Sequence, residues 1–173
     1  EAIPHLEHWI DLNPGQRDER NNAYLLLAEV YRQLEDPAKE QETLLRVAKL
    51  SGSAVDTFGR LMELGMQARN WPLVERHARN FLAVNPLLTD PHQNLGRSCE
   101  AQDKDADAIN AYRKLLELDP ADPADVHFRL GRLLKKEDAE TSRLHILKAL
   151  EEAPRFRAAH KLLLEFPQKK EDE

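Results

Sequence analysis

Several features are scarce in this sequence of 173 residues, and each shortage excludes a class of structure. Only six glycines and few β-branched residues are present, which argues against an extensive β-sheet. A single cysteine, Cys99, excludes an intrachain disulfide framework but leaves the compartment open. No apolar run approaches the roughly 20 residues that span a bilayer, so we expect no membrane insertion.

The motifs of common catalytic and cofactor sites are missing as well. The sequence contains no HExxH, no CxxC and no glycine-rich phosphate loop. Its formal net charge of −6 does not favour non-specific binding to nucleic acid or to an anionic membrane. We therefore expect a protein that is not an enzyme and that binds no cofactor and no nucleic acid.

An initiator methionine and a visible signal peptide are also lacking. We expect the chain to be a fragment of a longer protein, in which targeting signals would lie outside this segment. The compartment stays unassigned, with a soluble cytoplasmic domain as the default expectation.

What is present favours helix, because Ala, Leu, Glu, Lys and Arg are abundant and charged residues make up 32% of the chain. Three segments, "RNFLAVNP", "RKLLELDP" and "LKALEEAP", end on evenly spaced prolines, namely Pro86, Pro120 and Pro154. Successive prolines of this set are 34 residues apart, and the same interval separates Leu27, Leu61 and Leu95, with Leu130 following one position late. Such a period indicates a helical repeat protein. We interpret the slip at Leu130 as one residue added in "DPADPAD" and one removed near "KKEDAE".

Within a repeat, the apolar spacing predicts two helices. A first stripe with spacing i, i+3, i+4, i+7 consists of His92, Leu95, Gly96 and Cys99. A second consists of Ala108, Tyr112, Leu115 and Leu116. The break between them, "AQDKDAD", is short and polar, so the two helices should pack antiparallel.

Proline marks both ends of the predicted helices. The evenly spaced prolines follow helix ends, because proline disfavours helical conformation in the residue before it. Three Asp-Pro pairs predict helix starts, with Asp as N-cap and Pro as first helical residue. These pairs are Asp36-Pro37, Asp90-Pro91 and Asp122-Pro123.

A helix-turn-helix unit of about 34 residues resembles the tetratricopeptide repeat. The best match to the family pattern is the set Leu95-Gly96, Ala108, Tyr112 and Pro120. Residues 55–88 depart from it, since Met62 stands where Gly is usual, Gly65 where Tyr is usual and Val74 where Ala is usual. The resemblance implies an all-α, right-handed superhelical solenoid of antiparallel helix pairs, with about ten helices.

We expect one array over residues 1–173. Residues 1–14 read as the second helix of a truncated repeat. Four repeats follow at 21–54, 55–88, 89–122 and 123–156, then a capping helix at 157–166 and a polar tail at 167–173.

Arrays of this kind mostly bind other proteins on their concave side. In the resembled family, repeat positions 2, 5, 9 and 12 face that groove. Here position 5 reads Leu25, Gly59, Gln93 and Phe128, and position 9 reads Glu29, Glu63, Arg97 and Arg132. Position 12 reads Arg32, Met66, Glu100 and Lys135. The chaperone-binding clamp of some members is excluded, because its Lys and Asn are replaced here by Leu25 and Glu29.

The C-terminal half of this groove is rich in cations, which bind carboxylates well. We hypothesise that it receives a protein or peptide, as an acidic segment or as the C-terminus of a partner. The groove residues of this hypothesis are Glu63, Gln93, Asn94, Arg97, Phe128, Arg129, Arg132, Lys135 and Lys161. The alternative is that these side chains form solvated faces with local ion pairs, such as Glu63 with Arg97.

Histidines and the cysteine have structural interpretations. His92, His127 and His160 share position 4, but packed helices lie about 8–10 Å apart, too far for three imidazoles to reach one ion. We expect them to be partly buried and to bind no metal, and Cys99 to be a buried apolar residue.

Two other functions remain open. The C-terminal repeats are similar to arrays that follow bacterial metallopeptidase-like domains, so the chain would be the accessory module of a larger enzyme. Alternatively, an exposed terminal repeat would form a homo-oligomer.

Overall fold

The computed structural model describes residues 2–15 and 22–166, which form α-helices and no β-strand. The helices are α1 (Ala2–Leu12), α2 (Ala23–Gln33), α3 (Pro37–Leu50), α4 (Val55–Gln67), α5 (Trp71–Val84), α6 (Thr89–Glu100), α7 (Asp105–Glu117), α8 (Pro123–Leu134), α9 (Ala139–Glu152) and α10 (Arg157–Leu163). None of these helices is long and apolar enough to cross a membrane. The expected all-α architecture, with about ten helices, is confirmed for the described residues.

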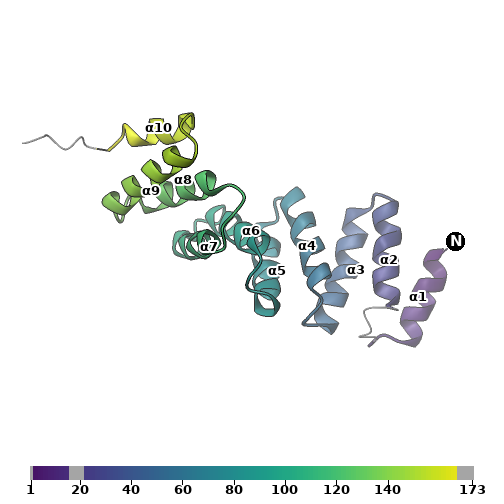
Figure 1. Ribbon diagram of the computed structural model, residues 1–173. Coiled ribbons are helices and arrows are strands. Elements are labelled where there is room, and N and C mark those ends of the chain that lie inside the picture. Colours follow the sequence, from purple (N-terminus) through teal and green to yellow (C-terminus); the bar gives the residue numbers. More distant parts are fainter. Residues whose placement is uncertain (1, 16–21, 167–173) are drawn as a thin grey trace, which may run out of the picture. The chain divides into compact units, whose positions relative to one another are not determined.

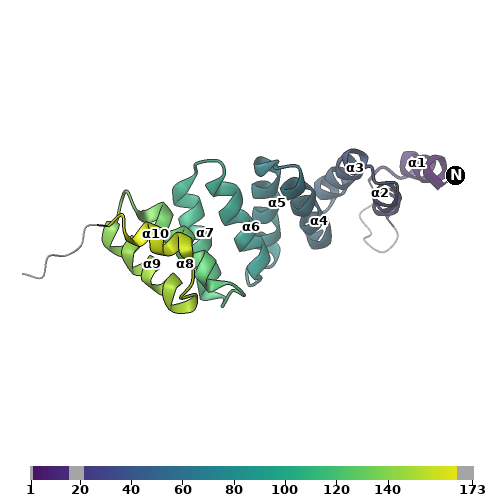
Figure 2. The same cartoon turned by 90° about the horizontal axis from the view of Figure 1, so that it is seen from above.

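Contacts divide the chain into two units, which are described separately. Unit 1, Glu1–Pro86, contains α1 to α5, and unit 2, Leu87–Glu173, contains α6 to α10. Inside each unit, the extensive contacts join helices that follow one another in the sequence. In Figures 1 and 2, α2, α3 and α4 lie side by side in unit 1. Each pair therefore buries its apolar stripe against its sequence neighbours, as in repeat proteins.

The leucines at the repeat period form the interior. Leu27, Leu61, Leu95 and Leu130 are all buried. Close packing beside them requires glycine: a Cβ on Gly96 would lie 2.7 Å from Cδ1 of Tyr112, and one on Gly131 would lie 2.7 Å from Cγ1 of Ile146. These are points where the first helix of a pair touches the second, so any side chain there would overlap its neighbour.

In residues 55–88, which depart from the family pattern, the close contact between a glycine and the second helix lies one helical turn later. Met62 is buried where the two following repeats have Gly96 and Gly131. A Cβ on Gly65 would instead lie 2.8 Å from Cγ2 of Val74 on the second helix. The larger residue and the glycine have exchanged places along one face of α4, and the bulkier Val74 fills the space that Gly65 leaves.

The turn inside three of the helix pairs has the same backbone. Glu35, Arg69 and Asp103 each have positive φ, between 53° and 55°, although none is glycine. In each case the next residue donates its amide to a carbonyl five residues back, as Asn70 does to Gly65 at 2.8 Å. These residues terminate α2, α4 and α6 in the left-handed conformation that is common at helix ends.

The two changes of repeat length lie in loops. The hydrogen bond that closes the α8–α9 turn spans one residue fewer than in the other pairs, because Asp138 donates to Leu134, four residues back, at 2.8 Å. The α7–α8 linker has five residues, 118–122, whereas the linkers 51–54 and 153–156 have four. Its Asp119 has a φ of 54°. The insertion therefore lies in the α7–α8 linker, and the deletion lies between the buried Leu134 and the N-cap Asp138.

One predicted helix start is wrong. Asp36 and Asp122 cap α3 and α8 as expected, accepting amide hydrogen bonds at 3.1 Å and 3.0 Å. However, α6 begins at Thr89, and its N-cap Leu88 makes no side-chain cap. Asp90-Pro91 therefore lies inside the first turn of α6. Proline is tolerated there because the amides of the first turn have no helical acceptor.

The first and last helices of the described residues are α1 and α10. Helix α1 lies within predicted residues 1–14, and α10 lies within predicted residues 157–166. Against α9, the end of the chain buries Ala159, Leu162 and Phe166 in a cluster with Ile146 and Ala149. The predicted tail at 167–173 lies outside the described residues, and the exact repeat boundaries stay predictions.

Candidate functional site

In unit 2, three of the predicted groove cations converge on two carboxylates. Arg129 on α8 donates from Nε to Asp125 at 2.7 Å and from Nη1 to Glu100 at 2.8 Å. Arg132 also pairs with Glu100, and Arg97 lies 3.9 Å from Asp125. These contacts join α6 to α8 and neutralise much of the positive charge expected there.

A buried tyrosine supports this network from α7. The Tyr112 hydroxyl donates to Glu100 at 2.8 Å. Burial raises the pKa of Tyr112, against the opposing effect of Arg129, so the hydroxyl remains a proton donor. Because Tyr112 also packs on Gly96, the charge network is tied to the core of the helix pair.

The remaining predicted groove residues of unit 2 are dispersed. Lys135 pairs with Glu165, which follows α10, and Phe128 packs against Phe156 with ring centroids 4.8 Å apart. Lys161 on α10 is exposed, and Gln93 and Asn94 on α6 are half-buried.

Unit 1 contains a hollow of about 570 Å³ between α2, α3 and α4. Six residues at the predicted groove positions line it: Leu25, Glu29, Arg32, Asp56, Gly59 and Glu63. Its apolar lining includes Ala28, Leu44, Val47, Ala54, Val55 and Phe81. The sequence predicted a ligand-binding surface among the cations of unit 2 and gave no indication of this hollow in unit 1.

Gly59 keeps the hollow open. A Cβ at this position would meet a single described atom within 4 Å, Cε2 of Phe81 at 3.8 Å. This is ordinary van der Waals contact, unlike the overlap at Gly96. Gly59 therefore leaves space in the lining rather than allowing helices to pack closely.

A buried ion pair forms one wall of the hollow. Glu40 on α3 is only 3% exposed and accepts from Nε and Nη2 of Arg60 on α4 at 2.7 Å and 3.0 Å. Arg60 Nη1 donates to Glu63 at 2.8 Å. The hydrogen bonds to Glu40 and Glu63 raise the pKa of Arg60. Spacing within single helices offers no sign that Arg60 on α4 pairs with Glu40 on the preceding helix.

The histidine predictions are partly correct. His92 is buried and His127 half-buried, but His160 is exposed, with Nε2 2.9 Å from the Pro154 carbonyl, so its predicted burial is wrong. Because α10 is the last of the packed helices in the described part of the sequence, no further helix there covers this position.

His127 on α8 forms a pair with His145 on α9. Their Nδ1 atoms lie 2.9 Å apart, and the ring centroids lie 5.1 Å apart. The two atoms therefore point at each other, as in a hydrogen bond in which one ring donates, rather than at a shared ion. Burial lowers the pKa of both rings, that of His145 to about 4 with a further effect of His127.

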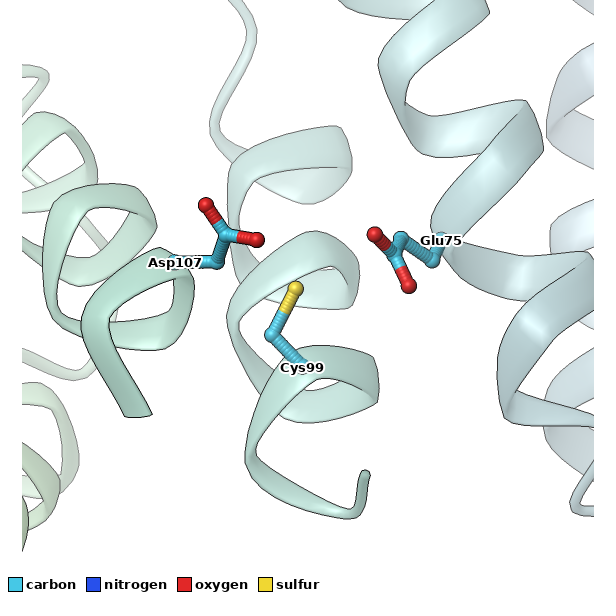
Figure 3. A group of neighbouring side chains, drawn as sticks. All are labelled: Glu75, Cys99 and Asp107. Atoms are coloured by element: carbon cyan, nitrogen blue, oxygen red, sulfur yellow. The ribbon is translucent and has the colours of Figure 1, made fainter. Parts of the chain in front are cut away.

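Cys99 on α6 is buried, as predicted, and Figure 3 shows it beside Asp107 of α7. Cys99 Sγ and an Asp107 carboxylate oxygen lie within 4.8 Å of each other. Glu75, also labelled, belongs to unit 1. Within unit 2 this pair offers two ligands, whereas a structural zinc site takes four.

Comparisons with known proteins agree with this architecture. Two family models, both described as tetratricopeptide repeat, match residues 22–53 and residues 90–122. No curated protein matches the sequence.

Several solved structures share the fold. A crystal structure of MamA has 18% identity and a TM-score of 0.64 and covers 87% of this chain and 86% of that chain. YrrB, described as a TPR protein with an unusual peptide-binding site, has 17% identity and a TM-score of 0.67, covering 92% and 84%. MamA from Desulfovibrio magneticus RS-1 has 18% identity and a TM-score of 0.61, covering 90% and 86%. The chain therefore contains tetratricopeptide repeats, at residues 22–53 and 90–122, and shares the fold of solved tetratricopeptide repeat proteins.

Proposed function

We propose that this chain is a non-catalytic scaffold that holds a peptide segment of another protein in the hollow of unit 1. Tetratricopeptide repeat proteins commonly serve as protein-interaction scaffolds, and the similar protein YrrB is described as having a peptide-binding site. The observation that carries the proposal is that groove-position residues from two successive repeats line one hollow.

The hollow has the composition of a binding site. Its volume of about 570 Å³ lies within the range of about 300–1,000 Å³ that is typical of ligand sites. Apolar side chains form its floor and charged groups its edge, the arrangement that supplies affinity and orientation respectively. Arg60 holds α4 to α3 through buried Glu40, so this wall is preorganised.

The test fills the hollow without disturbing the core. Peptides are selected from a displayed random library on the unaltered chain, and their affinities are measured for Gly59→Leu and Gly52→Leu. Gly52 is the matched control, because it is exposed and has no atom within 4 Å of its Cβ position. We expect Gly59→Leu to lower affinity by about tenfold or more, while Gly52→Leu retains it.

Equal affinities for both variants would contradict binding in the hollow. Circular dichroism melting of both variants separates blocked binding from unfolding. We expect Gly59→Leu to remain folded, because leucine is the better helix former and meets little resistance at that position.

A second candidate site is the cationic patch of unit 2, defined as Arg97, Arg129, Arg132, Lys135 and Lys161. Three carboxylates, those of Glu100, Asp125 and Glu165, pair with the first four of these groups. The patch therefore keeps an excess of two positive charges, and we propose that it attracts an acidic segment or the C-terminus of a partner.

A further inference from the structure

We infer that the unit 1 hollow selects a basic peptide segment, with a Lys or Arg side chain lying across the apolar floor and its charged end among carboxylates at the edge. This inference rests on the proposed function and names the chemistry of the partner. The acidic ligand that the sequence suggested belongs to the C-terminal half of the groove, so the hollow of unit 1 takes a ligand of the opposite charge.

The charges of the hollow are predominantly negative. Its lining contains four carboxylates, those of Glu29, Glu40, Asp56 and Glu63, and two guanidinium groups, those of Arg32 and Arg60. The net charge of the lining is therefore −2. A cation entering the hollow gains attraction, whereas a carboxylate meets repulsion.

The two arginines are already engaged. All three guanidinium nitrogens of Arg60 donate to Glu40 or Glu63. Arg32 Nη1 lies 3.4 Å from Glu29. An acidic peptide would have to displace the glutamates from these arginines. Displacing Glu40 from Arg60 would leave a buried carboxylate unpaired, which is strongly destabilising.

The carboxylates at the edge, by contrast, remain accessible to a ligand. The side chains of Glu29 and Glu63 are 50% and 65% exposed, and Asp56 is an exposed residue in the first turn of α4. Each carboxylate accepts several hydrogen bonds, so Glu63 can bind a ligand cation without releasing Arg60.

The floor suits the aliphatic part of a basic side chain. Leu25, Val55 and Phe81 line the hollow, and Phe81 lies beside the space that Gly59 leaves open. Lys and Arg bury their methylene stems on apolar surface while the charged end stays at a polar edge. The hollow has an apolar floor and carboxylates at its edge, so a single Lys or Arg side chain can contact the floor with its methylene groups and the carboxylates with its charged end.

The experiment uses the same random library and scores the charge of selected peptides. Among peptides whose binding is lost in Gly59→Leu, we expect Lys and Arg to exceed Asp and Glu. For one such peptide, the double variant Glu29→Gln/Glu63→Gln should weaken binding about fivefold to tenfold. Raising the salt from about 50 mM to about 300 mM should weaken binding to the unaltered chain.

The matched control is Glu7→Gln/Glu42→Gln, which removes two exposed carboxylates of unit 1 that do not line the hollow. This control should change affinity less than about twofold. Glu40 is left intact, because removing it would strand Arg60 and unfold the wall.

The outcomes distinguish this inference from the proposed function. Peptides that depend on Gly59 but carry no excess of basic residues would overturn the inference and leave the function in place. If no selected peptide depends on Gly59, both fail. Equal losses in the Glu29/Glu63 and Glu7/Glu42 variants would show general charge attraction and would also overturn the inference.

Discussion

At the scale of single residues, glycine has two opposite roles in this protein. Gly96 has none of the space that a side chain needs, since its Cβ would overlap Tyr112, whereas Gly59 has one neighbour at 3.8 Å. Both are helical, so both carry the same intrinsic helix cost relative to alanine, about 1 kcal/mol. Only the packing around them distinguishes a structural glycine from one that opens a surface.

Alanine at these two positions should therefore give opposite results. Gly96→Ala should lower the free energy of unfolding by about 1–3 kcal/mol, because overpacking outweighs the gain in helix propensity. Gly59→Ala should raise it by up to about 1 kcal/mol. Urea unfolding followed by circular dichroism measures both, and a loss of similar size in the two variants would contradict this account.

A second residue-scale prediction concerns His77 on α5. It is 2% exposed, stacks on Phe58 with centroids 5.9 Å apart, and has no hydrogen-bond partner on either ring nitrogen among the described residues. Burial, with a smaller effect of Arg76, lowers its pKa from 6.5 to about 4. Between pH 6.5 and about pH 4, His77 is therefore protonated in the unfolded chain but neutral in the folded chain.

Stability should accordingly be full above pH 6.5 and fall as the pH drops from 6.5 towards 4, by about 1–3 kcal/mol from this residue. His77→Leu removes one ionisable ring and should make this fall in stability smaller, while the contribution of His127 and His145, whose pKa values are also lowered, remains. Urea unfolding at pH 7.5 and pH 4.5 measures the difference. An unchanged difference between the two pH values in His77→Leu would rule His77 out as its source.

At the scale of elements, the turn inside a helix pair depends on one residue with positive φ. Glu35, Arg69 and Asp103 adopt it without being glycine, which costs roughly 1 kcal/mol each. The α8–α9 turn, closed by the hydrogen bond from Asp138 to Leu134, has no such residue among the positive-φ positions. Helix pairs of this protein therefore close through either of two turn geometries.

Arg69→Gly should relieve that strain and raise the free energy of unfolding by up to about 1 kcal/mol. The contrasting variant is Arg76→Gly, an exposed position inside α5, where glycine should cost about 1 kcal/mol. Thermal and urea unfolding of both variants test the sign of each change. Destabilisation by Arg69→Gly would show that the arginine stabilises the fold by more than the backbone strain costs.

At the scale of the whole molecule, the two units carry opposite surface charge at their groove positions. The hollow of unit 1 has a net charge of −2, while the cationic patch of unit 2 keeps two positive charges in excess. We therefore propose that each unit binds a different segment of a partner. The acidic-ligand hypothesis from the sequence applies to unit 2 alone.

That hypothesis has its own test. Arg97→Glu/Arg132→Glu should abolish binding of a fluorescein-labelled peptide that ends in four glutamates, because the patch then becomes net negative. The control is Arg143→Glu/Lys148→Glu, two exposed cations of α9 outside the patch. Fluorescence anisotropy measures both, and unchanged affinity in the patch variant would reject the proposal.

Sequence alone determined the helix pairs, the repeat period and the inward-facing leucines, because these follow from spacing along one helix, whereas it wrongly placed His160 in the interior. It also located the two changes of length, since proline and leucine return to phase on either side of them. The tertiary structure decided which charges neutralise each other, such as Glu40 with Arg60 and Glu100 with Arg129. It also decided that Gly59 opens a surface and Gly96 closes one. These properties depend on how separate helices pack against one another, and no periodicity within a single helix encodes that.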